Sequence, residues 1–224
     1  EYGFISAARR NAGDGQYYWR ITQWLMPFHN MIPSAEWPVL SGRMWVPIDD
    51  YTTYTWDWAY CRDKPLQPRF WELFNSGLAF PPEREYGPVK LHDGAIIDTW
   101  RPVRNVDNDY LLDREGQFKD LFSGLYGVND QDRAVQEGMG PIVDRSKENL
   151  VATDAAVVAL RRTLLDWVKR FESGEELTPA TNGSMYDIKA LDVISPHAEL
   201  DDLLESEFGD MSTTWPDHKL TAAE

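Results

Sequence analysis

The order of the secondary-structure signals most constrains the fold of this chain: strand-like runs fill the first sixty residues, and one long amphipathic helix follows much later. That helix is predicted over residues 154–172, with Thr153 as its cap and Gly174 after its end. Its apolar stripe consists of Val157, Leu160, Leu164, Val168 and Phe171. This order predicts an α+β domain whose helix lies against a curved antiparallel sheet, the helix-grip (Bet v 1-like or START-like) fold. Such a fold encloses a cavity suited to an apolar ligand.

Aromatic and β-branched side chains mark the predicted strands. The strands are expected over residues 2–8, 16–32, 42–48 and 52–60. Residues 11–15 form a turn cluster, because Asn, Asp and Gly accept the backbone angles of tight turns. Asp49 and Asp50 separate the last two runs and predict a hairpin there.

The middle and the end of the chain carry weaker signals. Residues 63–98 hold five prolines and are expected to form a long loop, either a lid or an intersubunit arm. Short helices are predicted over residues 110–121 and 130–138, the second capped by Asn129. We expect one main domain over residues 1–173 and an irregular, loosely packed acidic tail over residues 174–224.

Composition excludes several classes of partner. The net charge of -15 disfavours binding to nucleic acid or to an anionic membrane surface. No run of about 18 apolar residues predicts a transmembrane helix. Cys61 is the single cysteine, which suits a reducing cytoplasm and excludes a disulfide framework within the chain. The high aromatic content indicates a folded protein with large flat side chains in its core or lining a pocket.

Asp132 is the main candidate for a residue with a chemical role. It follows Asn129, Asp130 and Gln131 at a predicted helix start, where acidic residues complement the helix dipole. It could equally be the carboxylate of a 2-His-1-carboxylate triad, which holds non-haem Fe(II) and leaves positions open for oxygen. Spacing alone leaves both interpretations open.

Several separate blocks of sequence carry a resemblance to a known family. They occur in the family's order at residues 2–6 (YGFIS), 18–22 (YWRIT), 26–33 (MPFHNMIP), 42–50 (GRMWVPIDD), 108–150, 144–150 (DRSKENL) and 153–157 (TDAAV). Together they cover roughly residues 1–172 and resemble the catalytic domain of Rieske non-haem iron aromatic-ring oxygenases, in the phthalate dioxygenase branch. In that family, the Asp at the position of Asp132 is an iron ligand.

The resemblance implies a complete set of cofactors and partners. The family's alpha subunit joins an N-terminal Rieske [2Fe-2S] domain to a helix-grip catalytic domain. Electrons pass from NAD(P)H through a reductase or ferredoxin-type donor to the Rieske cluster, and then to mononuclear Fe(II) in a neighbouring subunit of a homotrimer. Iron and O2 then hydroxylate an aromatic ring or oxidise an O-methyl group. The implied protein is cytoplasmic and acts on a small aromatic compound, most simply an aromatic carboxylate.

The chain departs from the family in its histidines. The family's two His ligands lie five residues apart, upstream of the first strand seen here, and this sequence has no such pair. His29 is interpreted as structural, His197 and His218 as surface residues, and His92 as a residue of the long loop. One cysteine cannot ligate a Rieske cluster. We therefore interpret the sequence as a fragment that lacks the N-terminal part.

Substrate contacts are predicted from residue type. The guanidinium of arginine can bind a carboxylate through two parallel hydrogen bonds, a bidentate geometry. Arg9 and Arg43 lie in or near the predicted sheet and are the candidates for this contact. Salt bridges would explain the same residues. Aromatic side chains that could line the pocket, or equally the core, are Trp24, Phe28, Trp45 and Trp56. Some residues could orient Asp132 by bonding to it without binding the metal themselves. The candidates for this role are Gln131, Gln136 and Glu137.

Two other functions remain open. A helix-grip module could bind an apolar ligand without chemistry, although it would have no reason to aim an unpaired carboxylate into its pocket. A trimer-forming assembly subunit is the third possibility.

If the oxygenase interpretation holds, residues 1–224 alone should be inactive, because the His ligands and the Rieske domain are missing. An assay of NADH-coupled hydroxylation with a reductase checks this expectation. Turnover above the rate without the chain would contradict it.

Overall fold

The computed structural model describes residues 2–33, 40–61, 64–78, 81–186 and 188–208. Described residues within Glu1–Met44, Trp58–Arg62 and Leu150–Glu224 form one compact unit, and those within Trp45–Asp57 and Asp63–Asn149 form the other. The strands are β1 (Gly3–Gly13), β2 (Gln16–Leu25), β3 (His29–Ile32), β4 (Leu40–Pro47), β5 (Thr53–Tyr60), β6 (Arg84–Lys90), β7 (Ile96–Pro102) and β8 (Leu191–Ser195). The α-helices are α1 (Pro68–Asn75), α2 (Val128–Glu137), α3 (Ala155–Glu172), α4 (Thr178–Thr181) and α5 (Leu200–Phe208).

Short 3-10 helices connect these elements. They are η1 (Val106–Leu111), η2 (Gly116–Phe118), η3 (Arg145–Lys147), η4 (Ala152–Asp154) and η5 (Gly183–Tyr186). No helix within the described ranges is both long enough and apolar enough to cross a membrane.

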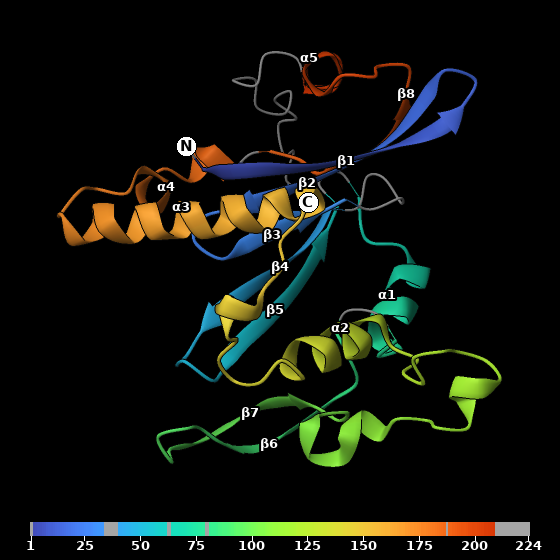
Figure 1. The fold of residues 1–224 in the computed structure, drawn as a ribbon, viewed down its shortest axis with the longest axis vertical. Coiled ribbons are helices and arrows are strands. Elements are labelled where there is room, and N and C mark those ends of the chain that lie inside the picture. The colour runs from blue at the N-terminus through green and yellow to red at the C-terminus, as the bar shows by residue number, and fades with distance from the viewer. Residues whose placement is uncertain (1, 34–39, 62–63, 79–80, 187, 209–224) are drawn as a thin grey trace, which may run out of the picture. The chain divides into compact units, whose positions relative to one another are not determined.

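The main sheet is antiparallel, in the order β1-β2-β3-β4-β5 (Figure 1). Helix α3 contacts β1, so the predicted α+β class with a long helix against an antiparallel sheet is confirmed. The helix runs over the expected residues, but it begins after Asp154 with no side-chain cap. The predicted apolar stripe is partly wrong, because Val157, Val168 and Phe171 are exposed and the buried residue of the helix is Trp167.

The C-terminal segment contributes a strand and a helix to the fold. Strand β8 pairs with residues 17–21 of β2, while β3 pairs with residues 23–25 of the same strand. Helix α5 places Leu203 in a core cluster with Trp19, Ile21 and Leu191. The expectation of an irregular tail is therefore wrong for residues 191–208. The acidic composition of the tail obscured two signals: the short apolar strand β8, and a helix, α5, with one apolar side.

The second unit is built around a two-stranded sheet of β6 and β7. The prolines of residues 63–98 were interpreted as a long loop, and this prediction is wrong. Pro68 occupies the first turn of α1, where its missing N–H costs nothing, and Pro88 lies within a strand that has a single partner. Two of the five prolines therefore lie within regular elements, at a helix start and in an edge strand.

Two further helix predictions need correction. Residues 110–121 form no α-helix, because Asp109, Tyr110 and Leu111 adopt left-handed backbone angles and only the short η2 follows. Helix α2 begins at Val128 with Gly127 as its cap, rather than after Asn129. The predicted hairpin at Asp49 is confirmed, since its carboxylate accepts the backbone N–H groups of Tyr51 and Thr52.

A core substitution tests whether the C-terminal segment is part of the folded domain. Leu203→Ala removes a fully buried side chain and should destabilise the protein by about 2–5 kcal/mol. Leu165→Ala, at an exposed position of α3, should change stability by less than about 0.5 kcal/mol. Urea unfolding monitored by tryptophan fluorescence measures both. Equal stabilities of the two variants would contradict the packing of α5.

Candidate functional site

The start of α2 is fixed by a glycine and a buried acid. The backbone N–H of Val128, the first residue of the helix, donates to the carbonyl of Leu78 at 3.1 Å. Asp130 lies in the first turn, where its charge complements the free N–H groups of the helix. A Cβ at Gly127 would stand 2.8 Å from the Asp130 Oδ2, so a larger residue would displace that carboxylate. The first-turn role considered for Asp132 therefore belongs to Asp130.

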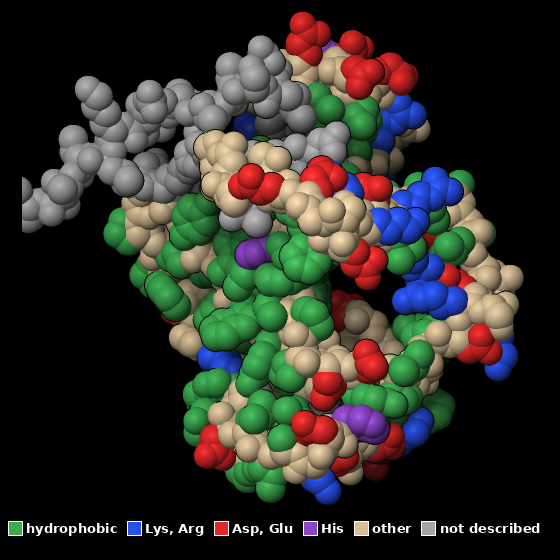
Figure 2. Space-filling view, turned by 90° about the vertical axis from the view of Figure 1, so that its left-hand side faces the viewer, with side chains coloured by type: hydrophobic (Ala, Val, Ile, Leu, Met, Phe, Trp, Pro, Cys, Tyr) green, Lys and Arg blue, Asp and Glu red, His purple; other side chains and the backbone are tan. Residues whose placement is uncertain are grey.

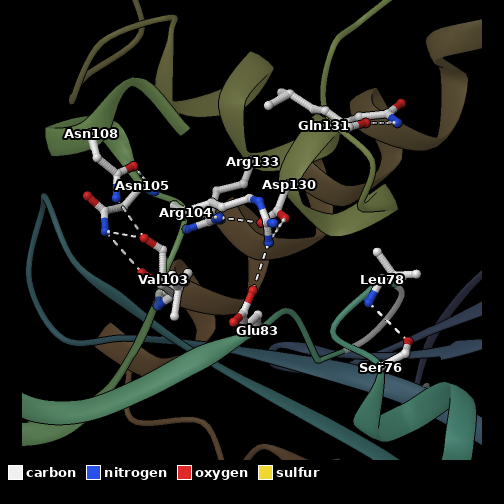
Figure 3. Close-up of polar contacts among 12 residues, drawn as sticks. Ser76, Leu78, Glu83, Val103, Arg104, Asn105, Asn108, Asp130, Gln131 and Arg133 are labelled. Carbon is white, nitrogen blue, oxygen red and sulfur yellow. Dashed lines mark hydrogen bonds and ion pairs between the residues drawn. The ribbon is translucent and has the colours of Figure 1, made fainter. Parts of the chain in front are cut away.

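Asp130 is the centre of a buried ion network (Figure 3). Its side chain is 2% exposed, with Oδ1 2.7 Å from Arg133 Nη2 and Oδ2 3.8 Å from Arg104 Nη1. Arg104 Nη1 also lies 3.0 Å from Glu83 Oε2, and Arg133 Nη2 donates to the Arg104 carbonyl. A buried carboxylate is tolerated only with such partners. The network thus ties α2 to the segments before β6 and after β7.

Asp132 lies on the other side of the same helix. Two residues along a helix correspond to a turn of about 200°, so Asp132 points away from the side on which Asp130 is buried. Its side chain is exposed, which leaves the carboxylate accessible to a ligand.

A complete iron site needs more than Asp132 supplies. Among the described residues, no group of three His, Cys, Asp or Glu side chains could hold a metal ion. A mononuclear iron that used Asp132 would therefore need its other protein ligands from outside the described residues.

A strained turn follows β7. Asp109, Tyr110 and Leu111 have φ angles of 53°, 55° and 50°, in the left-handed region that costs non-glycine residues about 1–2 kcal/mol each. Two asparagine side chains hold the approach to this turn (Figure 3). Asn108 Nδ2 donates to the Val103 carbonyl at 2.7 Å, and Asn105 Nδ2 donates to the same carbonyl at 3.2 Å.

The strained turn brings Tyr110 against α2. The Tyr110 hydroxyl donates to Glu137 Oε2 at 2.5 Å, and the Arg133 guanidinium lies over the Tyr110 ring at 5.8 Å. Burial, and then the bond to Glu137, raises the pKa of Tyr110 to about 12. The phenol therefore stays protonated and can donate throughout the neutral range.

The three candidates for orienting Asp132 have different surroundings. Gln131 Nε2 donates to the Leu125 carbonyl at 2.6 Å, so it fixes the loop before α2. Glu137 accepts from Tyr110, and Gln136 is exposed on the helix surface. None of the contacts named here joins these side chains to Asp132 directly.

The substrate candidates divide between the two faces of the sheet. Trp24 pairs with Asn30, and Asn30 with Arg43, so these three side chains share one face. Arg9 pairs with Trp19 and lies on the face that α5 covers. Its guanidinium stacks over the Tyr17 ring and donates to the Ala198 carbonyl. Arg9 and Arg43 therefore do not point to the same side of the sheet.

Arg43 is the buried one of the two arginines. It is 8% exposed, and its backbone N–H donates to Asn30 Oδ1 at 3.0 Å. Trp45 is half-buried two positions further along β4, and Phe28 lies in the turn before β3, stacked on His29. The fourth aromatic candidate, Trp56, is exposed on β5.

The described histidines are spread over the chain. His29 stacks with Phe28 beside Tyr186, and burial lowers the pKa of His29, as expected for a structural histidine. His92 stacks on Tyr51 with ring centroids 3.7 Å apart. His197 is half-buried rather than on the surface, and its carbonyl accepts from Trp19 Nε1. His218 lies outside the described residues.

An antiparallel sheet contacted by a long helix is the arrangement of a helix-grip domain. Comparison with known families identifies the family. The chain belongs to the family described as LigXa C-terminal domain like, whose sequence profile matches residues 1–199.

Two curated relatives extend the comparison. The chain is 31% identical over 188 residues to the 3-chlorobenzoate-3,4-dioxygenase oxygenase subunit of Comamonas testosteroni, covering 80% of this chain and 42% of that protein. It is 35% identical over 180 residues to the phthalate 4,5-dioxygenase oxygenase subunit of Pseudomonas putida, covering 78% of this chain and 37% of that protein. The matches confirm the predicted resemblance to phthalate-type oxygenase subunits. The matched region is about two fifths of each relative's length.

Sequence reasoning missed the two features that anchor α2. Asp130 was treated as a neighbour of Asp132, because a local pattern does not show that Arg104 approaches from a distant segment. The Tyr110 turn was interpreted as helix. Its sequence signal is the pair Asn105 and Asn108, whose side chains bond to the nearby backbone and so compete with regular helix.

The ion network should dominate the stability of the second unit. Asp130→Ala leaves Arg104 and Arg133 without their shared anion and should destabilise it by about 3–5 kcal/mol. Asp120→Ala removes an exposed carboxylate from the same unit and should cost less than about 0.5 kcal/mol. Thermal unfolding with circular dichroism compares them. A Tm for Asp130→Ala within error of that for Asp120→Ala would refute the anchoring role.

Proposed function

We propose that this chain is part of the catalytic domain of the oxygenase (alpha) subunit of a Rieske-type aromatic-ring oxygenase, an oxidoreductase that uses O2 and mononuclear non-haem Fe(II). The observation that carries the proposal is similarity to two dioxygenase oxygenase subunits over about four fifths of the chain. An accessible carboxylate at the family's ligand position supports it. The proposal covers ring hydroxylation and O-demethylation alike.

Asp132 is the proposed metal ligand of this chain. A carboxylate and two imidazoles form the facial triad of non-haem Fe(II) oxygenases, with open positions for oxygen. When bound, the iron supplies the activation of O2. Asp132 donates one oxygen ligand from α2, and the two histidines come from outside residues 1–224. The buried side of α2 holds the helix in place, while the exposed side leaves Asp132 accessible to the polypeptide that carries the two histidines.

The proposed substrate is an aromatic carboxylate. The names of both relatives refer to such compounds, a chlorobenzoate and a phthalate. Arg43 is the better candidate to bind the carboxylate, because it shares its sheet face with Trp24, whose ring offers apolar contact. Arg9 is the second candidate and lies on the opposite face of the sheet, where Leu203 of α5 packs against Trp19.

The proposed partners follow from the same class. A reductase or ferredoxin-type donor would pass electrons from NAD(P)H to a Rieske [2Fe-2S] cluster outside this chain, in a cytoplasmic homotrimer. Large apolar side chains are exposed on the described surface of each unit, and hydrophobic side chains are visible at the surface in Figure 2. Surface of this kind is typical of protein contacts and supports assembly with other domains or subunits.

The other two functions are less favoured. A non-catalytic helix-grip module or an assembly subunit would share the fold, but both relatives bear the names of oxygenase subunits. An exposed carboxylate on a helix that is anchored from its opposite side also suits a metal ligand better than an apolar binding pocket.

Iron binding tests the role of Asp132. In the oxygenase that contains this domain, Asp132→Ala should lower Fe(II) affinity by at least about tenfold, because one of three protein ligands is lost. Asp120→Ala, also exposed in the same unit, should bind iron as the unaltered protein does. Titration with Fe(II) under anaerobic conditions measures both. Equal affinity of the two variants would remove Asp132 from the metal site.

Substrate affinity tests the role of Arg43. Arg43→Lys keeps the charge but loses the planar fork, and should raise KM for an aromatic carboxylate by about 10- to 100-fold. KM for the uncharged amide analogue should stay within about threefold, since no carboxylate is present to bind. Arg9→Lys tests the second candidate and should leave both KM values unchanged. A rise in KM for the carboxylate in this variant alone would assign the role to Arg9. The proposal fails if Arg43→Lys raises KM for the carboxylate and for the amide together, or raises neither.

A further inference from the structure

Helix α2 is held along one stripe. Asp130, Arg133 and Glu137 recur at intervals of three and four residues, so they lie on one side of the helix. Asp130 and Arg133 belong to the ion network, and Glu137 is bound only through Tyr110 in the contacts described here. Asp132 lies on the opposite side. The direction of its carboxylate therefore depends on how firmly this stripe is fixed.

Tyr110 is the contact that holds the C-terminal half of the stripe. Its hydroxyl donates to Glu137, the last residue of α2, and its ring lies beneath the Arg133 guanidinium. One side chain thus engages two positions one turn apart. The ion network itself fixes only residues 130 and 133.

The backbone of Tyr110 shows that this placement is maintained against local preference. Three consecutive non-glycine residues adopt left-handed angles, and this conformation persists only where surrounding contacts impose it. The Tyr110 N–H donates to the Asn105 carbonyl at 2.8 Å, and Asn105 and Asn108 bond the preceding segment. Relaxing the turn to ordinary angles would swing the ring away from Glu137.

We propose that Tyr110 is a positioning residue that clamps α2 through Glu137 and Arg133 and so fixes the direction of the Asp132 carboxylate. The inference deepens the proposed function and rests on it, because the direction of Asp132 matters only if Asp132 is a ligand. Tyr110 acts through the helix and touches neither iron nor substrate. Outer contacts of this kind orient metal ligands and raise their affinity.

The test compares variants in the oxygenase that contains this domain. Tyr110→Phe removes the hydroxyl and keeps the ring, while Glu137→Leu severs the same bond from the helix side. Glu137→Gln keeps an acceptor oxygen and is the conservative rescue. Tyr126→Phe is the matched control, because its hydroxyl donates to Asp113, outside α2.

Two readouts are taken for each variant: amide hydrogen exchange of α2 and the Kd for Fe(II). Tyr110→Phe and Glu137→Leu should speed exchange in the second half of α2 and weaken Fe(II) binding by about tenfold, the low end for outer-shell contacts. Glu137→Gln and Tyr126→Phe should match the unaltered protein in both. Should either severing variant fail to fold, the other gives the same comparison.

The outcomes separate this inference from the function on which it rests. Unchanged exchange and Kd in Tyr110→Phe, while Asp132→Ala loses iron, would overturn the clamp and leave the metal ligand standing. Faster exchange in Tyr110→Phe with iron binding insensitive to Asp132→Ala would remove the ligand role, and with it the purpose of the clamp. Loss of iron affinity in Tyr126→Phe as well would show a general loosening and would also overturn the proposal.

Discussion

The buried carboxylate of Asp130 is the interaction on which the candidate site depends. A helix of ten residues has little stability of its own in water, so α2 must be held by tertiary contacts. Asp130 supplies them by taking a charge out of water and pairing it with Arg104 and Arg133. Gly127 leaves the room that the carboxylate needs. Through Arg104 and its partner Glu83, the segments after β7 and before β6 are both linked to this carboxylate.

The same helix shows a division of labour between its two sides. The side that carries Asp130, Arg133 and Glu137 attaches the helix to neighbouring segments. One of these segments is the strained turn at Tyr110. The side of Asp132 makes none of these contacts and is exposed. If Asp132 is the proposed metal ligand, its carboxylate is left accessible because it takes no part in anchoring the helix.

The C-terminal segment covers part of one face of the main sheet. Strand β8 continues the edge of β2 beyond β3, and α5 buries Leu203 against Trp19 and Ile21. Arg9 is drawn into that arrangement by its bonds to the residues before α5. Arg43 and Trp24 lie on the other face. Two arginines that look equivalent in the sequence therefore have different potential for binding a substrate.

The sequence by itself determined the α+β class, the long helix α3, the hairpin at Asp49 and the resemblance to oxygenase subunits, because periodicity, turn residues and motif order are local properties of the chain. It did not reveal the Asp130 network, the left-handed turn at Tyr110, the pairing of β8 with β2 or the division of Arg9 and Arg43 between faces. Each of these depends on contacts between segments that are far apart in the chain. Only tertiary structure decides them, since a charge or a strained turn is stable where its distant partners meet it.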